Sequence, residues 1–301
     1  MEGKIIVLYA LIWYSFSIFQ TMVDKRFYLK YPLPITISFS HMLINPIGLW
    51  FAAYMSKAPQ ILLSRVHFVQ VFCLAVFKVF VSVFSHYTSL LLTVPLMQAL
   101  KSMSPIFVVT VSRFAYGTSY SSKVYSSLVL MMFGTVIATY TQHTIVYSGL
   151  LTSALMVVSS QSQNLFLKRT YDKIILNPFA LLFNVHLVGF ILVIPLWLFM
   201  DLPYILSSDD FEENPGWFFA SCMLQGACSI MTHLMKVLIL STCTSLTYSV
   251  AETGKALFKV ILGFVHYERP TGIMNVLGTL VALSGVLFYS KAKIEEKVKM
   301  E

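Results

Sequence analysis

Long apolar runs, separated by short polar or proline- and glycine-containing stretches, follow one another along almost the whole chain. A run of about 20 apolar residues can cross a bilayer as a helix, whereas a membrane β-barrel would show shorter segments of alternating polarity. The runs predict ten membrane-spanning helices, at residues 4–22, 34–54, 67–91, 94–115, 124–141, 148–167, 178–200, 216–240, 244–265 and 271–290. The pattern therefore predicts an all-α polytopic membrane protein.

The composition agrees with this fold class. Of the 301 residues, 57% are hydrophobic and 11% are charged, whereas soluble domains carry about 25% charged residues. The four cysteines lie in apolar segments without metal-ligand spacing, so we expect them to pack as small side chains. No metal spacing, phosphate-binding glycine-rich loop or catalytic nucleophile constellation is visible. We therefore expect neither an enzyme nor a cofactor, a metal or a nucleic-acid partner.

The two halves of the chain resemble each other. The tetrapeptides DKRF (24–27) and LKRT (167–170) each precede a span that starts with proline and contains a histidine, His41 in the first half and His186 in the second. Because each half holds five spans, the second would be inserted upside down relative to the first, which is the inverted-repeat plan of secondary transporters. The predicted division is a first five-helix repeat at 1–146, a second at 147–290 and a basic tail at 291–301.

The distribution of basic residues predicts an orientation and a compartment. Lysines and arginines near the helix ends gather on the side that holds both termini, which predicts cytosolic termini. The first apolar run lacks a small-residue cleavage site, so we expect no cleaved signal. The segment Lys297-Val298-Lys299-Met300-Glu301 fits the K-x-K-x-x pattern that retrograde coat proteins read. We therefore expect a multi-pass protein of the endoplasmic reticulum or Golgi, with coat proteins binding Lys297 and Lys299.

Polar residues follow one face of the predicted ninth span. Tyr248, Glu252, Lys255 and Lys259 recur at spacings of four, three and four residues, which places them on one side of a helix. A charge near the middle of a membrane helix costs roughly 2.5–3.5 kcal/mol unless it faces water, a partner or a ligand. The face therefore predicts a transport pathway, in which Glu252 either neutralises Lys255 or carries a proton.

Other predicted spans carry matching polar faces. The candidate substrate-binding residues are the four above together with Lys78 and His86 on the third span, Gln98 and Lys101 on the fourth, and Thr232 and His233 on the eighth. Lysines outnumber the single glutamate, so the interior should be basic and favour an anion such as a phosphorylated sugar, an organic acid or a nucleotide diphosphate. Lys78 and Lys259 lie close enough to helix ends to reach the membrane interface. Each is therefore either a pathway residue or a lysine whose ammonium extends to the interface. His41 and His186 are interpreted as packing histidines.

Two segments are similar to a known family. The segments HYTSLLLTVPLMQALKSMSPIFVVTVSR (86–113) and NVLGTLVALSGVLFYSKAK (275–293) resemble the triose-phosphate translocator branch of the drug/metabolite transporter superfamily. The resemblance is nearest to the E branch of solute carrier family 35, which is related to the nucleotide-sugar transporters. The pieces that carry it are the K-x-x-x-P of 101–105, the Ser-Arg of 112–113 and the SLTYSVA of 245–251.

The resemblance implies ten helices in two inverted halves and exchange or facilitated transport of phosphorylated metabolites. In plastid members of the family, phosphate is bound by a lysine that matches Lys101 and by a Lys-Arg pair whose lysine matches Lys255. The arginine position is Ala256 here, the histidine three residues before the first lysine is Gln98, and the asparagine three residues before Lys255 is Glu252. Loss of a guanidinium and gain of a carboxylate weaken a phosphate site.

The first functional hypothesis is a secondary carrier, an antiporter or facilitator, that moves an anionic small metabolite across a lipid membrane by alternating access. Its cargo would be a phosphorylated sugar, an organic phosphate or a nucleotide sugar, with Lys101 and Lys255 as anion contacts. One alternative is a non-transporting membrane protein of the endoplasmic reticulum or Golgi that uses the same scaffold in trafficking. The other is a proton-coupled carrier of a less acidic solute, in which Glu252 titrates.

Overall fold

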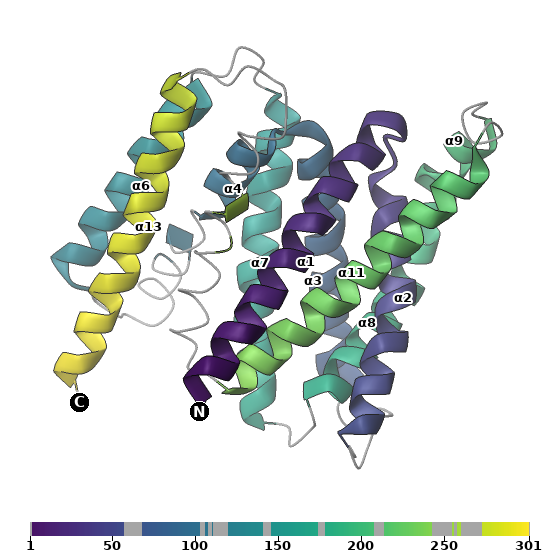
Figure 1. Cartoon of the computed structure of the whole chain (residues 1–301), viewed down its shortest axis with the longest axis horizontal. Helices are drawn as coiled ribbons and strands as arrows, with labels where there is room; N and C mark the ends of the chain where they lie inside the picture. Colours follow the sequence, from purple (N-terminus) through teal and green to yellow (C-terminus); the bar gives the residue numbers. More distant parts are fainter. Residues whose placement is uncertain are drawn as a thin grey trace. The chain divides into compact units, whose positions relative to one another are not determined.

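The computed structural model describes residues 2–56, 68–102, 106–107, 110, 120–140, 146–173, 178–207, 214–242, 255, 258–259 and 273–300. Within these ranges every regular element is a helix and no strand occurs (Figure 1). The helical segments long and apolar enough to cross a membrane are Pro34–Met55, Phe68–Leu91, Phe179–Met200 and Pro215–Lys236. Shorter apolar helical segments are Ser122–Ile137 and Val276–Ala292. The prediction of an all-α polytopic membrane protein is confirmed.

The chain divides into two compact units, each built from two separate segments. Unit 1 contains Met1–Leu90 and Ser162–Ser241, and unit 2 contains Leu91–Gln161 and Thr242–Glu301. Each unit therefore takes residues from both predicted sequence halves. The repeats at 1–146 and 147–290 stay a prediction, because contact within a unit does not report duplication of the sequence.

Unit 1 holds the longest apolar helices. Its elements are α1 (Glu2–Lys30), α2 (Pro34–Met55), nearly all of α3 (Phe68–Leu91), the later part of α7 (Tyr147–Lys173), α8 (Pro178–Met200), the short α9 (Leu202–Ser207) and α11 (Pro215–Thr242). The helices α2, α8 and α11 each begin with proline, whose missing N–H costs nothing in a first helical turn. The proline-led starts at 34 and 178 are confirmed, while the one-turn α9 was not predicted.

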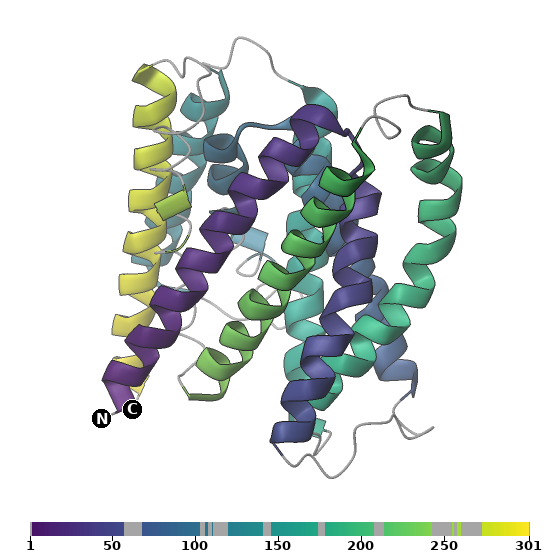
Figure 2. The same ribbon diagram turned by 45° about the vertical axis from the view of Figure 1, so that its right-hand side comes forward.

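A carboxylate from another helix completes the start of α2. Leu33 at the N-cap offers no side-chain acceptor. Asp201 Oδ2, directly after α8, accepts hydrogen bonds from the Thr36 backbone N–H at 2.7 Å and from the Thr36 hydroxyl at 2.8 Å. A negative charge at a helix N-terminus is favourable because free N–H groups point towards it. The contact fixes the end of α8 against the start of α2, and the two helices pack along their length (Figure 2).

Burial affects the Asp201 carboxyl itself. Asp201 is only 5% exposed. Burial raises the pKa of this carboxyl above its usual value, and the hydrogen bonds from Thr36 act against that rise. Asp201 is therefore a titratable group at the junction of α8 and α9.

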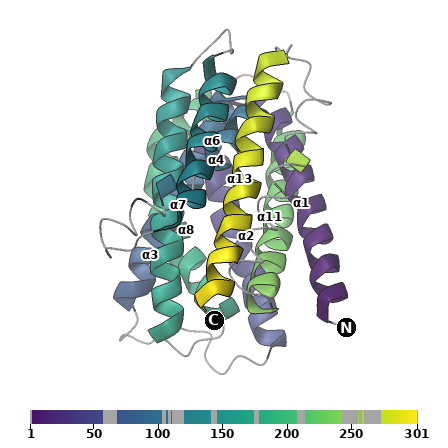
Figure 3. The same ribbon diagram turned by 90° about the vertical axis from the view of Figure 1, so that its left-hand side faces the viewer.

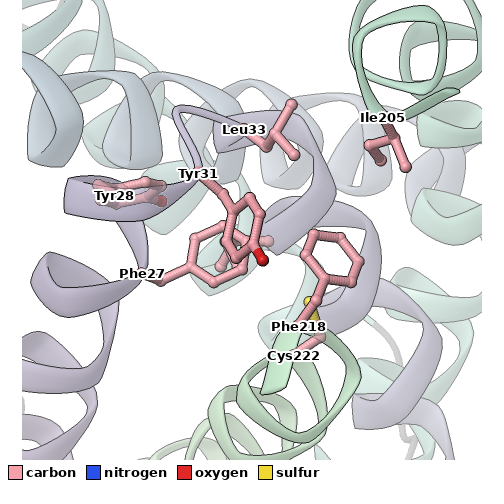
Figure 4. Packing of buried hydrophobic residues seen from close by; sticks show 8 residues of the cluster. Phe27, Tyr28, Tyr31, Leu33, Ile205, Phe218 and Cys222 are labelled. Carbon is pink, nitrogen blue, oxygen red and sulfur yellow. The ribbon is translucent and has the colours of Figure 1, made fainter. Parts of the chain in front are cut away.

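An aromatic cluster joins the end of α1 to the start of α11. Figure 4 shows Phe27 and Tyr31 against Phe218 and Cys222. The ring of Tyr31 lies 5.5 Å from that of Phe27 and meets that of Phe218 edge-on at 5.2 Å. Such aromatic pairs stabilise by about 0.5–1.5 kcal/mol beyond the area that they bury.

Contacts of charged residues inside unit 1 explain why α1 is longer than predicted. The apolar pattern ends the first span at residue 22, but the helix continues to Lys30. The intervening charges are accommodated inside unit 1, where Asp24 is 8% exposed and the Lys25 ammonium donates to the Ser89 carbonyl of α3. Because a partner satisfies the charge, the polar residues do not end the helix.

Unit 2 is built on close contact between backbones. Its helices are α4 (Val94–Ser102), α6 (Ser122–Tyr140), the earlier part of α7 and α13 (Ile273–Met300). The helices α6 and α13 lie side by side (Figure 3). A Cβ added at Gly134 would lie 2.2 Å from the backbone nitrogen of Ala282, so only glycine permits this approach. The last span was predicted to end at 290, but α13 continues to Met300, and Glu295 on this extension pairs with Lys123 at 2.6 Å.

Candidate functional site

The helices of unit 1 bring four histidines together in two pairs. The rings of His41 (α2) and His86 (α3) have centroids 4.9 Å apart and planes inclined by 62°. The rings of His186 (α8) and His233 (α11) have centroids 5.0 Å apart and planes inclined by 72°. The second pair follows the first by about half the chain, as the predicted duplication requires. Unit 1 therefore contains two histidine pairs of nearly the same geometry.

The first pair lies within a chain of hydrogen-bonding groups. His41 Nδ1 is 3.3 Å from His86 Nε2. At one end, His86 Nδ1 is 2.8 Å from the Tyr28 hydroxyl, and at the other, His41 Nε2 is 3.5 Å from the amide nitrogen of Gln20. If the Gln20 amide donates, each neutral ring accepts at one nitrogen and donates at the other, and Tyr28 accepts at the far end. Every ring nitrogen of this pair thus has a neighbour.

The second pair has different partners. His186 Nδ1 lies 2.8 Å from the Leu182 carbonyl, an acceptor, so this nitrogen carries the proton and donates. His233 Nε2 lies 3.3 Å from the Lys78 ammonium, which is the donor. His186 Nε2 is buried and has no hydrogen-bond partner among the described residues.

Lys78 belongs to the polar face that was predicted on α3. Ser82, His86 and Ser89 of this face are buried, and Lys78 itself is half-buried. Residues at these spacings share one side of a helix. The structure therefore places the polar face of α3 in the interior of unit 1.

The facing sides of α2 and α11 add further polar atoms. The Asn45 amide donates to the Ser229 hydroxyl at 3.0 Å. Gln225, one turn before Ser229, is fully buried, and neither of its amide atoms has a partner among the described residues, nor has Asn45 Oδ1. The helices approach closely here, since a Cβ on Gly226 would lie 2.2 Å from the Ile44 side chain.

The two pairs lie in different electrostatic surroundings. The carboxylates of Asp24 and Asp201 act on Tyr28, at the end of the first pair. His186 and His233 are instead acted on by the ammonium groups of Lys78 and Lys236, and no carboxylate acts on either ring within the described part of the chain. No three His, Cys, Asp or Glu side chains in that part are grouped so as to hold a metal ion. The second pair therefore lies in a basic environment.

The predicted substrate-binding residues fall into three groups. Lys78, His86, Thr232 and His233 lie in unit 1 around the two histidine pairs. Gln98, Lys101, Lys255 and Lys259 lie in unit 2, where Gln98 is buried on α4 and the three lysines are half-buried. Tyr248 and Glu252 lie outside the described residues.

The predicted candidates did not include all residues of the two histidine pairs and their partners. Gln20 and Tyr28 lie on α1, which carried no candidate. His41 and His186 were interpreted as packing histidines, and this interpretation stays a prediction. The sequence did contain one signal, because the two histidines occupy matching places in the proposed repeats. A pair of matching polar residues in the two halves of an inverted repeat lies where such proteins bind their ligands.

The chain is similar in sequence to known transporters. The model of the triose-phosphate transporter family matches residues 4–290. Among the relatives, a phosphoenolpyruvate/phosphate translocator 3, chloroplastic, of Oryza sativa subsp. japonica is 26% identical, over 93% of this chain and 72% of its own. A triose phosphate/phosphate translocator of non-green plastids from Brassica oleracea var. botrytis is 22% identical, over 93% and 71%. A probable sugar phosphate/phosphate translocator of Arabidopsis thaliana is 24% identical, over 95% and 94%. The chain therefore belongs to the triose-phosphate transporter family.

Proposed function

We propose that this protein is a secondary carrier that moves a phosphorylated small metabolite across a membrane by alternating access. The relatives named above are translocators of phosphorylated compounds against phosphate, and the family comprises transporters rather than enzymes. The observation that carries the proposal is that Lys78 lies 3.3 Å from His233, whose ring packs against that of His186, with no carboxylate among the described groups that act on either ring.

Positive charge in the interior of unit 1 requires compensation. An ammonium group inside a membrane protein is costly unless a counter-charge or water faces it. The hydrogen bond from Lys78 to His233 satisfies one N–H of the ammonium but supplies no negative charge. A phosphate group would supply that charge and several acceptor oxygens.

Each unit contains residues with a proposed role in anion binding. In unit 1, Lys78 donates to the anion with an N–H that it does not give to His233. In unit 2, Lys101 and Lys255 are proposed anion contacts, as the family resemblance implies, with Gln98 on the same helix as Lys101. The repeats at 1–146 and 147–290 would be the two halves that rearrange during alternating access.

Exchange in liposomes tests the function. The purified protein would be reconstituted into vesicles preloaded with inorganic phosphate, and uptake of triose phosphates, phosphoenolpyruvate, pentose phosphates and nucleotide sugars would be measured. We expect uptake of one class that depends on internal phosphate and is lost in the Lys101→Ala/Lys255→Ala variant. Lys123→Ala is the matched control, because this lysine forms an exposed ion pair with Glu295.

Two results would contradict the proposal. Folded, reconstituted protein that exchanges none of these anions would favour the non-transporting alternative. Exchange that is equally fast in the double variant and in the control would remove Lys101 and Lys255 from the site.

We also propose a location in the endoplasmic reticulum or early Golgi, with both termini in the cytosol. The support is the excess of basic residues on the terminal side and the pair Lys297 and Lys299. The plant relatives named above include chloroplast proteins. Fluorescence imaging of the wild type and of Lys297→Ala/Lys299→Ala tests this, since the variant should move onward to later compartments, and a plastid or unchanged distribution would contradict it.

A further inference from the structure

One ring nitrogen in unit 1, His186 Nε2, is a buried acceptor without a hydrogen-bond partner among the described residues. His186 is fully buried, and its Nδ1 donates to the Leu182 carbonyl at 2.8 Å. In the neutral ring the remaining nitrogen, Nε2, then carries a lone pair and acts only as an acceptor. Nε2 has no hydrogen-bond partner among the described residues. A buried polar atom in this state is costly, so a ligand or proton that satisfies it is favoured.

The groups around His186 attract an anion. His233 meets it edge-on from α11, Lys78 acts on it from α3, Lys236 from α11 and His41 from α2. These groups are lysine side chains or imidazoles, and no carboxylate is among the described groups that act on His186. Lys78 and His233 are half-buried, whereas His186 lies fully buried against the His233 ring. An anion drawn to Lys78 would therefore come close to His186.

An anionic oxygen and the His186 lone pair cannot face each other without a proton. Both atoms are acceptors, so their approach is repulsive until one proton lies between them. The proton can reside on Nε2, which makes the ring an imidazolium, or on the phosphate oxygen. In either arrangement the complex holds one more proton than the empty site and the fully ionised anion together.

We propose that His186 couples the binding of each anion to the uptake of one proton. This rests on the proposed function and adds the proton site to it. Lys78 keeps its hydrogen bond to His233 and donates another N–H to the anion, one proton from water enters between His186 Nε2 and the anion, and both leave together on release. No covalent bond of the metabolite is made or broken.

The His41–His86 pair provides the internal comparison. Its ring nitrogens already face Gln20, each other and Tyr28, so no ring nitrogen is left to take up a proton with an anion. The proposal therefore assigns proton coupling to one pair only. It also places that role on His186 rather than on Glu252, the residue named in the sequence-based alternative.

Calorimetry measures the proton number directly. Phosphoenolpyruvate, whose phosphate monoester is fully ionised at about pH 8 and carries no P–OH, would be titrated into the full-length protein in detergent at that pH. The heat, measured in two buffers of different ionisation enthalpy, gives the protons taken up per anion bound. His186→Asn keeps an amide N–H for the Leu182 carbonyl but removes the Nε2 acceptor. We expect its proton number to be lower than that of the wild type by about one.

The controls separate the outcomes. Tyr28→Phe, which changes the network of the first pair at a residue that does not act on His186, should keep the wild-type number. His186→Gln, whose amide does not titrate, should show the same decrease as His186→Asn and serves if the Asn variant does not fold. Anion binding by the wild type without proton uptake, or with uptake that is unchanged in both His186 variants, would overturn this inference and leave the carrier proposal intact. Failure of the folded wild type to bind any tested anion would overturn both.

Discussion

The two histidine pairs of unit 1 have nearly the same ring geometry and different neighbours. Centroids are 4.9 Å apart in the His41–His86 pair and 5.0 Å apart in the His186–His233 pair. The first pair is enclosed by Gln20 and Tyr28 and lies near carboxylates at its Tyr28 end. The second lies beside two lysines.

Under the proposals above, the neighbours of a histidine pair decide its role. Where donors and acceptors match around both rings, the network rigidifies the helices. Where one ring nitrogen has no partner among the described residues and lysine lies nearby, a similar pair of rings would form the proposed anion site. If the chain is duplicated as predicted, one copy of the pair would serve packing and the other binding.

The largest expected effect follows from removing the ammonium beside the second pair. Lys78→Met keeps most of the apolar stem but removes the positive charge. A hydrogen bond to a charged group contributes about 1.5–3 kcal/mol, which corresponds to a loss of roughly 10- to 150-fold in affinity or rate. We expect a loss of this size in phosphate exchange by proteoliposomes. A variant that transports as well as Lys123→Met, the exposed-lysine control, would show that Lys78 is not an anion contact.

A change at the first pair should affect stability instead. Tyr28→Phe removes the hydroxyl that lies 2.8 Å from His86 Nδ1 and leaves the aromatic packing in place. Loss of one partner from a buried polar pair costs about 1–3 kcal/mol. Thermal unfolding in detergent should show this destabilisation, while the proton number of phosphate binding stays at the wild-type value. A changed proton number with unchanged stability would mean that the roles of the two pairs are reversed.

The helices could largely be predicted from the sequence because hydrophobic periodicity is a local property. Two of the errors lie at ends where another element satisfies a charge: Ser89 accepts from Lys25 of α1, and Lys123 of α6 pairs with Glu295 of α13. An apolar pattern ends at a charged residue whether or not a partner for that residue exists elsewhere in the fold.

Some residues of the candidate site could likewise be predicted from the sequence, and others could not. Lys78, His86 and His233 could be found because their spacing along single helices places them on polar faces. The roles of His41 and His186 could not, because an apolar helix containing one histidine looks the same whether its ring has two partners or one. That distinction depends on which helices pack together, and here α2 meets α3 while α8 meets α11.

A smaller effect is expected on the pH dependence of stability, from the carboxyl group of Asp201. Burial raises the pKa of Asp201, so folding binds protons at this carboxyl. The stabilisation from the protonated form is present below the unfolded pKa and is lost as pH rises through the folded pKa. The wild type should therefore lose stability relative to Asp201→Asn as pH rises from about 4. Thermal unfolding at several pH values measures it, and a difference that grows with pH would contradict the sign.

The proton number at about pH 8 is the control for that variant, because Asp201 does not act on His186 in the described structure. It should equal the wild-type number. A lower number in Asp201→Asn would mean that the uptake assigned to the second pair comes in part from this carboxyl.

The smallest effect is expected at Thr232, a candidate that lies next to His233 along α11. The Thr232 hydroxyl donates to the Ser229 carbonyl of its own helix at 2.9 Å. A threonine bonded in this way satisfies its own hydroxyl and adds little at the surface that it faces. Thr232→Val preserves the shape of the side chain, so phosphate exchange should stay within about threefold of wild type, equivalent to less than about 0.7 kcal/mol. A loss of phosphate exchange as large as that of Lys78→Met would show instead that the Thr232 hydroxyl turns to the anion. The proposed anion site would then extend from the His186–His233 pair along α11 to Thr232.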